Sequence, residues 1–304
     1  MLNRSSKLAF TMLELIFVIV IMGLLGKFGT EFLATAYENF LFSKINNTLH
    51  EQSSSAVEFI SKRLESRIKA SVIARNTTTG TYNFVNSAGT SDENATVLEW
   101  IGTDINGFRG TTSPLWSGII DLDISVSGPT NILSPDSDFN ATSTLITTLS
   151  PTGKTITGAA VYFIGSSITV NPWGYDGAIT DETHTLRPIQ RVPIAAIDRF
   201  QIEGGSVTGF TGIEVFEYYK LSTSAYAVAL DYNDTSNIGD LYFYYDYRPW
   251  KGETYTANGT KVLLAENIST FRYRGSGSLI KIQICAKSDL TNEEYSLCKE
   301  KTIY

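Results

Sequence analysis

Leu8-Ala9-Phe10-Thr11-Met12-Leu13-Glu14-Leu15-Ile16-Phe17-Val18-Ile19-Val20-Ile21-Met22-Gly23-Leu24-Leu25-Gly26 is the stretch that decides the fold of this 304-residue chain. From Phe10 to Gly26 it holds 17 residues and a single charge, Glu14. A helix of this length is at the lower end of what crosses a hydrocarbon layer of about 30 Å. The stretch therefore predicts a membrane anchor.

Glu14 is unusual in an ordinary anchor. An unpaired charge costs roughly 2.5 kcal/mol or more at the centre of a membrane helix and less near the interface. Glu14 either lies near the interface and complements the positive end of its own helix, or it pairs with a cation from a neighbouring subunit, because a low dielectric strengthens that attraction. We favour the pairing.

The leader before the anchor is short and basic. Arg4 and Lys7 precede the apolar run, and the positive-inside rule keeps them in the cytoplasm, so the chain after Gly26 is expected across the membrane. A secretory signal peptide is the rival interpretation. It fits less well, because no Ala-x-Ala site follows the apolar run and the sequence continues as helix.

Phe10-Thr11-Met12-Leu13-Glu14, placed after a basic leader and the small residue Ala9, resembles the type IV prepilin signal shared by type IV pilins and type II secretion pseudopilins. The resemblance covers Met1 to Phe28. It implies that a prepilin peptidase cuts between Ala9 and Phe10 and methylates the new amine of Phe10. The family usually has Gly where this chain has Ala9. Glu14 takes the fifth mature position, where the family keeps a Glu that attracts the amine of a neighbouring subunit.

A long helix is expected to follow. From Phe28 onward, apolar residues repeat at fours, which marks one face of an α-helix; they are Phe32, Ala36, Phe40, Ile45, Leu49, Ala56, Ile60, Leu64, Ile68 and Val72. Residues 10–75 thus predict one helix of roughly 100 Å, with a transmembrane half at 10–30 and an amphipathic half at 31–75. Residues 1–9 form the leader.

Three glycines recur in the predicted anchor, at Gly23, Gly26 and Gly29. Glycine lets helices approach closely in lipid and weakens a helix by about 1 kcal/mol each. We expect these positions to contact neighbouring subunits and to allow local unwinding on assembly. The family often has a proline at the mature position that Glu31 occupies here, so the unwinding would depend on the glycines.

Residues 76–304 predict a β-rich head. Residues 76–96 form a polar loop, and many short β segments follow without a helix-length periodic segment, which favours antiparallel sheet packed on the helix. The expected strands are 97–101, 118–127, 142–149, 158–164, 197–203, 213–221, 226–232, 241–247, 260–265, 270–274 and 279–285. The fold class is therefore α+β and pilin-like. The strand order over 239–284 is similar to that of large-headed minor pilins and pseudopilins of the J and W groups.

The composition suits a packed core and an acidic surface. The chain is 42% hydrophobic and 12% aromatic with net charge -7, and loss of the leader with Arg4 and Lys7 shifts the charge to -9. No nucleic acid partner is expected. His50 and His184 are the only histidines, and no metal set or Ser/His/Asp arrangement has a basis in spacing. We expect no enzyme; a membrane-anchored hydrolase is the weakest alternative.

Cys285 and Cys298 are the only cysteines. In an exported chain the oxidising compartment favours a disulfide, worth about 3 kcal/mol by loop entropy, and many pilins close a C-terminal loop in this way. Two free thiols are the alternative.

Asp136, Asp138 and Asn140 have the spacing that begins a calcium loop, but Ala141 and Thr147 stand where an EF-hand has Gly and Glu. A solvated acidic loop is the preferred interpretation, with calcium as the alternative cofactor.

Asn94, Asn140 and Asn233 lie in Asn-x-Ser/Thr acceptors with Asp two residues earlier, which resembles the extended bacterial N-glycosylation acceptor. Polar loops are the simpler explanation.

Trp173 and Trp250 lie in turn-like contexts. A tryptophan ring in such a place either stacks on a sugar or a partner protein or, more often, closes the end of a core.

The sequence as a whole predicts a minor pilin or pseudopilin of a type IV pilus or type II secretion filament. Its partners would be the prepilin peptidase, other pilins, the inner-membrane assembly platform and the inner membrane, with the head in the periplasm or, after assembly, outside the cell. The alternative is a filament-borne adhesin that binds through the disulfide loop and exposed aromatics.

Overall fold

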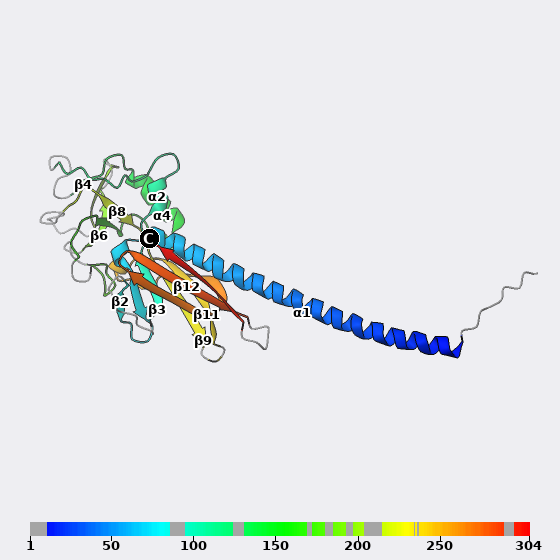
Figure 1. Ribbon diagram of the computed structural model, residues 1–304. Coiled ribbons are helices and arrows are strands. Elements are labelled where there is room, and N and C mark those ends of the chain that lie inside the picture. The colour runs from blue at the N-terminus through cyan, green and yellow to red at the C-terminus, as the bar shows by residue number, and fades with distance from the viewer. Residues whose placement is uncertain are drawn as a thin grey trace, which may run out of the picture. The chain divides into compact units, whose positions relative to one another are not determined.

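The computed structural model describes residues 11–85, 95–123, 131–168, 172–179, 185–192, 197–203, 215–233, 235, 237–288 and 295–304. The chain divides into two compact units, Met1–Glu51 and Gln52–Tyr304, which we name the N-terminal unit and the head. Both contain part of helix α1 (Met12–Glu65), drawn in blue in Figure 1. The predicted α+β fold class, with a long N-terminal helix and an antiparallel β head, is confirmed.

Helix α1 begins at Met12 because the two residues flanking its first turn cap each other. The Glu14 amide donates to Thr11 Oγ1 at 3.4 Å, and the Thr11 amide donates to Glu14 Oε2 at 3.5 Å. This reciprocal Thr-x-x-Glu arrangement is a capping box, which satisfies backbone donors that a helix start otherwise leaves unpaired.

Helix α1 ends at Glu65, ten residues before the predicted end at Arg75, so the predicted 31–75 amphipathic segment is wrong at its C-terminal boundary. The buried guanidinium of Arg67 donates to the Leu64 carbonyl at 2.7 Å and to the Ser278 carbonyl at 2.6 Å. It thereby satisfies a carbonyl of the last turn, as basic side chains often do at helix ends. A short 3-10 turn, η1 (Lys69–Ser71), then leads into strand β1 (Ile73–Asn76).

The larger sheet of the head has eight antiparallel strands in the order β13-β12-β11-β10-β9-β3-β1-β2. Besides β1 they are β2 (Tyr82–Phe84), β3 (Ala95–Ile101), β9 (Ala225–Asn233), β10 (Ile238–Tyr247), β11 (Thr260–Ser276), β12 (Leu279–Lys287) and β13 (Ser296–Ile303). The strands from β9 to β12 lie side by side in Figure 1. The turn η2 (Pro249–Lys251) follows β10.

The smaller sheet lies in an insertion between two neighbouring strands of the larger one. Its order is β4-β7-β6-β5-β8, formed by β4 (Ile132–Leu133), β5 (Ala159–Phe163), β6 (Leu186–Arg191), β7 (Arg199–Ile202) and β8 (Tyr219–Ser222). Helices α2 (Ile105–Arg109) and α4 (Phe139–Leu149) belong to the same segment. Strands β3 and β9 pair directly, with Ile101 opposite Ala225, so the chain leaves and rejoins the larger sheet at one point.

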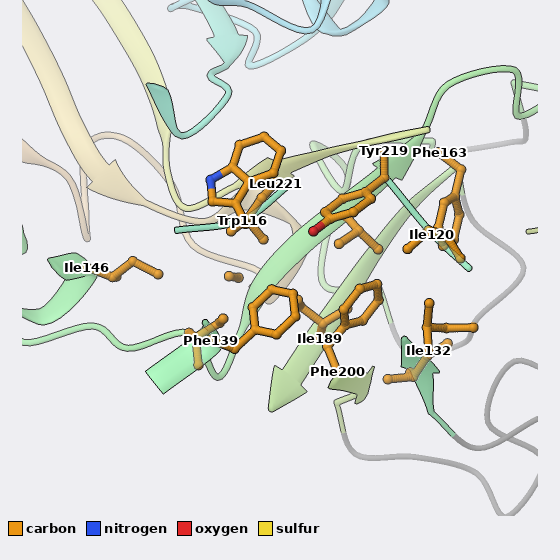
Figure 2. Close-up of a cluster of buried hydrophobic side chains, with 14 residues drawn as sticks. Trp116, Ile120, Ile132, Phe139, Ile146, Phe163, Ile189, Phe200, Tyr219 and Leu221 are labelled. Atoms are coloured by element: carbon orange, nitrogen blue, oxygen red, sulfur yellow. The ribbon is translucent and has the colours of Figure 1, made fainter. Parts of the chain in front are cut away.

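Among the described residues, two apolar clusters stand out in the core of the head. The first lies within the insertion, where Phe139 packs edge-on against Phe200, and Phe200 in turn against Tyr219 (Figure 2). The second joins Ala160, Trp173 and Leu186 of the insertion to Val97 and Tyr247 of the larger sheet. The insertion therefore has its own core and also shares one with the sheet.

The predicted strand at 142–149 is wrong, because this segment is helix α4. Asp138 caps it by accepting from the Asn140 and Ala141 amides, both at 2.9 Å. Phe139, Thr142 and Ile146 form its buried face, a helical spacing that the many β-branched residues obscured in the sequence. The predicted strand at 118–127 is also absent over its described part, 118–123, where Ile119 makes only a single bridge to Tyr218.

Candidate assembly site in the N-terminal unit

The N-terminal unit exposes a large number of apolar side chains on helix α1. Every large hydrophobic side chain from Met12 to Phe40 is exposed, over a range from 39% at Ile21 to 82% at Met12. Helix α1 is long and apolar enough to cross a membrane, with a mean hydropathy of 2.1 over a window of which 0% is buried. Apolar area of this extent is costly in water, so this surface requires lipid or other helices to cover it.

Glu14 stands at the start of this surface and is only loosely held by its own helix. Its Oε2 accepts from the Thr11 amide and hydroxyl, both at 3.5 Å, near the long limit of a hydrogen bond. Within the described part of the chain, no donor contacts Oε1. The capping role that the sequence left open is thus present, and one carboxylate oxygen is left for another donor.

No contact within the described chain explains why glycine stands at positions 23, 26 and 29. A Cβ atom built at any of the three has no atom within 4 Å, so the described chain does not need glycine there for space. Helix α1 runs through all three without interruption. Because glycine weakens a helix and these positions serve no packing inside the chain, they fit a surface that another helix approaches closely.

The predicted cleavage pair, Ala9 and Phe10, lies outside the described residues. Cleavage and methylation at this pair stay predictions.

The predicted disulfide between Cys285 and Cys298 is confirmed. The two cysteines are register partners on β12 and β13, with their Cα atoms 4.0 Å apart. Since β13 is the edge strand of the larger sheet, the bond fastens that edge to its neighbour.

Two of the three residues of the candidate calcium loop are used in other contacts. Asp138 caps α4, the amide oxygen of Asn140 accepts from Arg191 Nη1, and Asp136 has a positive φ of 58°. Among the described residues, no group of three or more His, Cys, Asp or Glu is placed to hold a metal ion. Capping explains Asp138 without an ion.

Of the three candidate glycosylation residues, Asn94 lies outside the described residues, while Asn140 and Asn233 are exposed. Asn140 is in the first turn of α4. Asn233 ends β9, and its Oδ1 accepts from the Thr235 amide at 2.9 Å. Asn233 therefore offers the more accessible loop setting.

Trp173 and Trp250 are both fully buried, at 0% exposure. The Trp250 indole donates to the Gly158 carbonyl at 2.8 Å, and both rings belong to the cluster shared by the insertion and the larger sheet. The packing interpretation is confirmed. The adhesin alternative is wrong in treating these two rings as exposed.

A buried charged group that the sequence analysis missed joins three strands of the larger sheet. Glu99 on β3 is 1% exposed and accepts from Arg75 Nε on β1 and from the Tyr247 hydroxyl on β10, both at 2.9 Å. Burial raises the pKa of Tyr247 well above its usual value, so the phenol stays protonated and donates. A single acid within the apolar run 97–101 was the available signal, because a buried carboxylate needs such partners.

No protein-family model, no curated protein and no solved structure matches this chain.

Proposed function

We propose that this chain is a structural subunit, a minor pilin or pseudopilin, of a type IV pilus or type II secretion filament. The observation that carries the proposal is the N-terminal unit, whose large apolar side chains are all exposed from Met12 to Phe40, with the loosely held carboxylate of Glu14 in the first turn. A lone anchor needs the apolar surface and uses an acid at its start only as a cap of its own helix. A helix that moves from lipid into a bundle of sister helices needs both.

Assembly would proceed through the same helix. The peptidase would cut between Ala9 and Phe10, and the new amine of Phe10 would pair with Glu14 of a neighbouring subunit, where exclusion of water strengthens the attraction. Gly23, Gly26 and Gly29 would let sister helices approach closely. The ion pair would fix the axial register, and the apolar side chains would supply most of the buried area.

The head would lie in the periplasm before assembly and outside the cell in a pilus. Its disulfide is in keeping with an oxidising compartment. The chemistry in this scheme is performed by the peptidase on the chain, and we propose no catalysis by the chain itself. The inner membrane and its assembly platform are the other partners of the scheme.

The experiment compares Glu14→Ala with the native chain in the native host. Glu14→Ala should leave the chain in the membrane fraction and lower its amount in sheared filaments by about tenfold or more, since an unpaired amine would remain buried. Glu31→Ala is the matched control, because Glu31 is an exposed acid of the same helix, and its one ion pair among the described residues is with Lys27, at 4.0 Å. This variant should assemble normally.

Intact mass and N-terminal sequencing of the native protein test the processing step. A chain that starts at a methylated Phe10 is expected. Native protein that starts at Met1, or Glu14→Ala subunits present in filaments at the native level, would overturn the proposal.

A further inference from the structure

The head contains a cleft that the assembly scheme does not use. It has a volume of about 740 Å³ and lies where the end of α1, the insertion and the larger sheet meet. Its walls come from residues 59–66, from residues 103–109 and 145–150 of the insertion, and from β9, β10 and β11. We name it the head cleft. Its volume is in the range of ligand sites, which often form between such parts of a protein.

Three cations of the head cleft have no acidic partner. Lys62, Arg63 and Arg109 are exposed, and within the described residues no carboxylate lies within ion-pair distance of them. In a chain of net charge -7, three unpaired cations around one cavity create a local field that attracts anions.

Two of the three acids in the lining are already used inside the protein. Asp104 accepts from the Gly107 amide at 3.1 Å and from the Trp116 indole at 3.2 Å. Asp246 accepts from the Ser150 hydroxyl at 2.9 Å and from the Thr152 hydroxyl at 2.7 Å. Glu65 is the remaining acid, so the cations outnumber the free acids of the lining.

The aromatic side chains of the head cleft direct the choice of ligand. Phe243 stacks with Tyr226 at a centroid distance of 5.5 Å and with Tyr245 at 6.0 Å, and Phe59 meets it edge-on at 5.0 Å. Arg63 lies over the rings of Phe59 and Tyr226 at 5.6 and 5.8 Å. Ring faces used in this way are not available to stack on a sugar, whereas ring edges are electropositive and suit carboxylates.

Apolar and polar groups of the lining complete the pattern. Leu149 is 51% exposed and Val262 is 43% exposed, so aliphatic side chains of a ligand would gain by covering them. Thr103 is buried, and its hydroxyl has no hydrogen-bond partner in the part of the chain that the structure describes. A ligand carbonyl or carboxylate oxygen would satisfy this hydroxyl, which otherwise carries a desolvation cost.

We propose that the head cleft binds a short acidic peptide segment of a partner protein, in which carboxylates alternate with aliphatic side chains. The carboxylates would pair with Lys62, Arg63 and Arg109, and the aliphatic groups would cover Leu149 and Val262. This proposal goes beyond the filament function and depends only on the head.

The test uses the full chain in nanodiscs of neutral phosphatidylcholine and a fluorescent peptide of alternating Glu and Leu. Fluorescence anisotropy should show binding that weakens with salt. The double variant Arg63→Gln with Arg109→Gln should bind at least about tenfold more weakly, since charge-assisted bonds are the strong ones. Arg272→Gln with Arg274→Gln is the matched control, because it removes the same charge from exposed arginines of β11 outside the cleft and should bind as the native chain does.

Two further comparisons separate the contribution of the Thr103 hydrogen bond from that of the ion pairs. Thr103→Val keeps the shape and removes the hydroxyl, so it should weaken binding by about threefold to tenfold with an unchanged salt dependence. A peptide with Gln in place of Glu should lose most of its affinity. Equal binding of the Gln peptide, equal binding by the Arg63/Arg109 variant, or tighter binding of an oligogalacturonate than of the peptide would overturn the proposal. These outcomes leave the filament proposal untouched.

Discussion

In the N-terminal unit, helix α1 exposes every large apolar side chain from Met12 to Phe40, whereas in the head the same helix buries Ala56, Ile60 and Leu64 completely. The residue types are similar, and both stretches are helical. The difference lies in what the chain itself provides as a partner. The head supplies a sheet and a core for its part of the helix, while the large apolar side chains from Met12 to Phe40 have no partner among the described residues and must obtain one from lipid or other helices.

The sharpest way to break this comparison is a pair of identical substitutions. Leu64→Ala should lower the free energy of unfolding of the head by about 2–5 kcal/mol, because it leaves a cavity in a fully buried site. Leu24→Ala should leave that free energy unchanged, since Leu24 is 54% exposed. Urea unfolding followed by tryptophan fluorescence measures both. Equal losses of unfolding free energy would show that Leu24 and Leu64 contribute equally to the stability of the head, which would contradict the comparison.

The next effect concerns the C-terminal edge of the head. Replacing Cys285 and Cys298 together by Ser should lower the free energy of unfolding by about 3 kcal/mol, because the bond that restricts the unfolded chain is lost. Membrane insertion should not change. Urea midpoints with and without reductant provide the measurement, and the native chain under reductant should behave like the double variant.

A smaller effect is expected from Tyr219, whose pKa burial raises to about 12. The unfolded chain loses this proton near pH 10, while the head keeps it, so stability is complete below pH 10 and falls as the pH rises from about 10 to 12. The loss amounts to roughly 2–3 kcal/mol at most. Tyr219→Phe should be about 1 kcal/mol less stable at neutral pH, because it loses the 2.8 Å bond to Ser134. Its stability should fall less steeply in alkali, and an unchanged slope would contradict this assignment.

The smallest effect on the head is expected from Gly26→Leu. No atom lies within 4 Å of a Cβ placed at this position, so the unfolding of the head should not change within error. Incorporation into filaments should fall, because a larger side chain keeps sister helices apart. A normal filament content would remove the glycines from the assembly surface. The variant thus separates a defect in assembly from a defect in folding.

The sequence predicted the parts of the fold in which local pattern and final contact agree. The apolar run predicted the N-terminal part of α1, and β-branched and aromatic runs predicted β3, β5, β9, β10 and β12. The end of α1 was missed because Ile68 and Val72 are buried at the helical spacing although they lie outside the helix. Arg67 satisfies a carbonyl of the last turn, and its other bond goes to the Ser278 carbonyl, which is far away in the sequence.

Two strands show other limits of local reasoning. Strand β6 was missed because Pro188 stands within it, and proline argues against a central strand. Strand β11 was predicted as two pieces, 260–265 and 270–274. The structure joins them through a register shift between Ile268 and Thr270 next to Asn267, which has a positive φ of 57°.

The candidate sites also differ in how far the sequence could predict them. Glu14 and the glycines were found from the sequence, because they lie in one contiguous apolar stretch. The head cleft was not, because its cations Arg63 and Arg109 come from segments that only the tertiary fold brings together. Exposure of Trp173 and Trp250 was considered because turn residues flank both, and a turn context does not report which way a ring points.

The pairing of Ile101 with Ala225 shows where a domain could be exchanged in an engineered form of this protein. Residues 102–224 begin and end beside each other, so an engineer could exchange them for a foreign domain with closely spaced termini while the strand pairing of the larger sheet is kept. The exchange would have to supply substitutes for Ala160, Trp173 and Leu186, which fill the shared cluster. In the proposed filament, such chimaeras would display a chosen cargo domain at the surface.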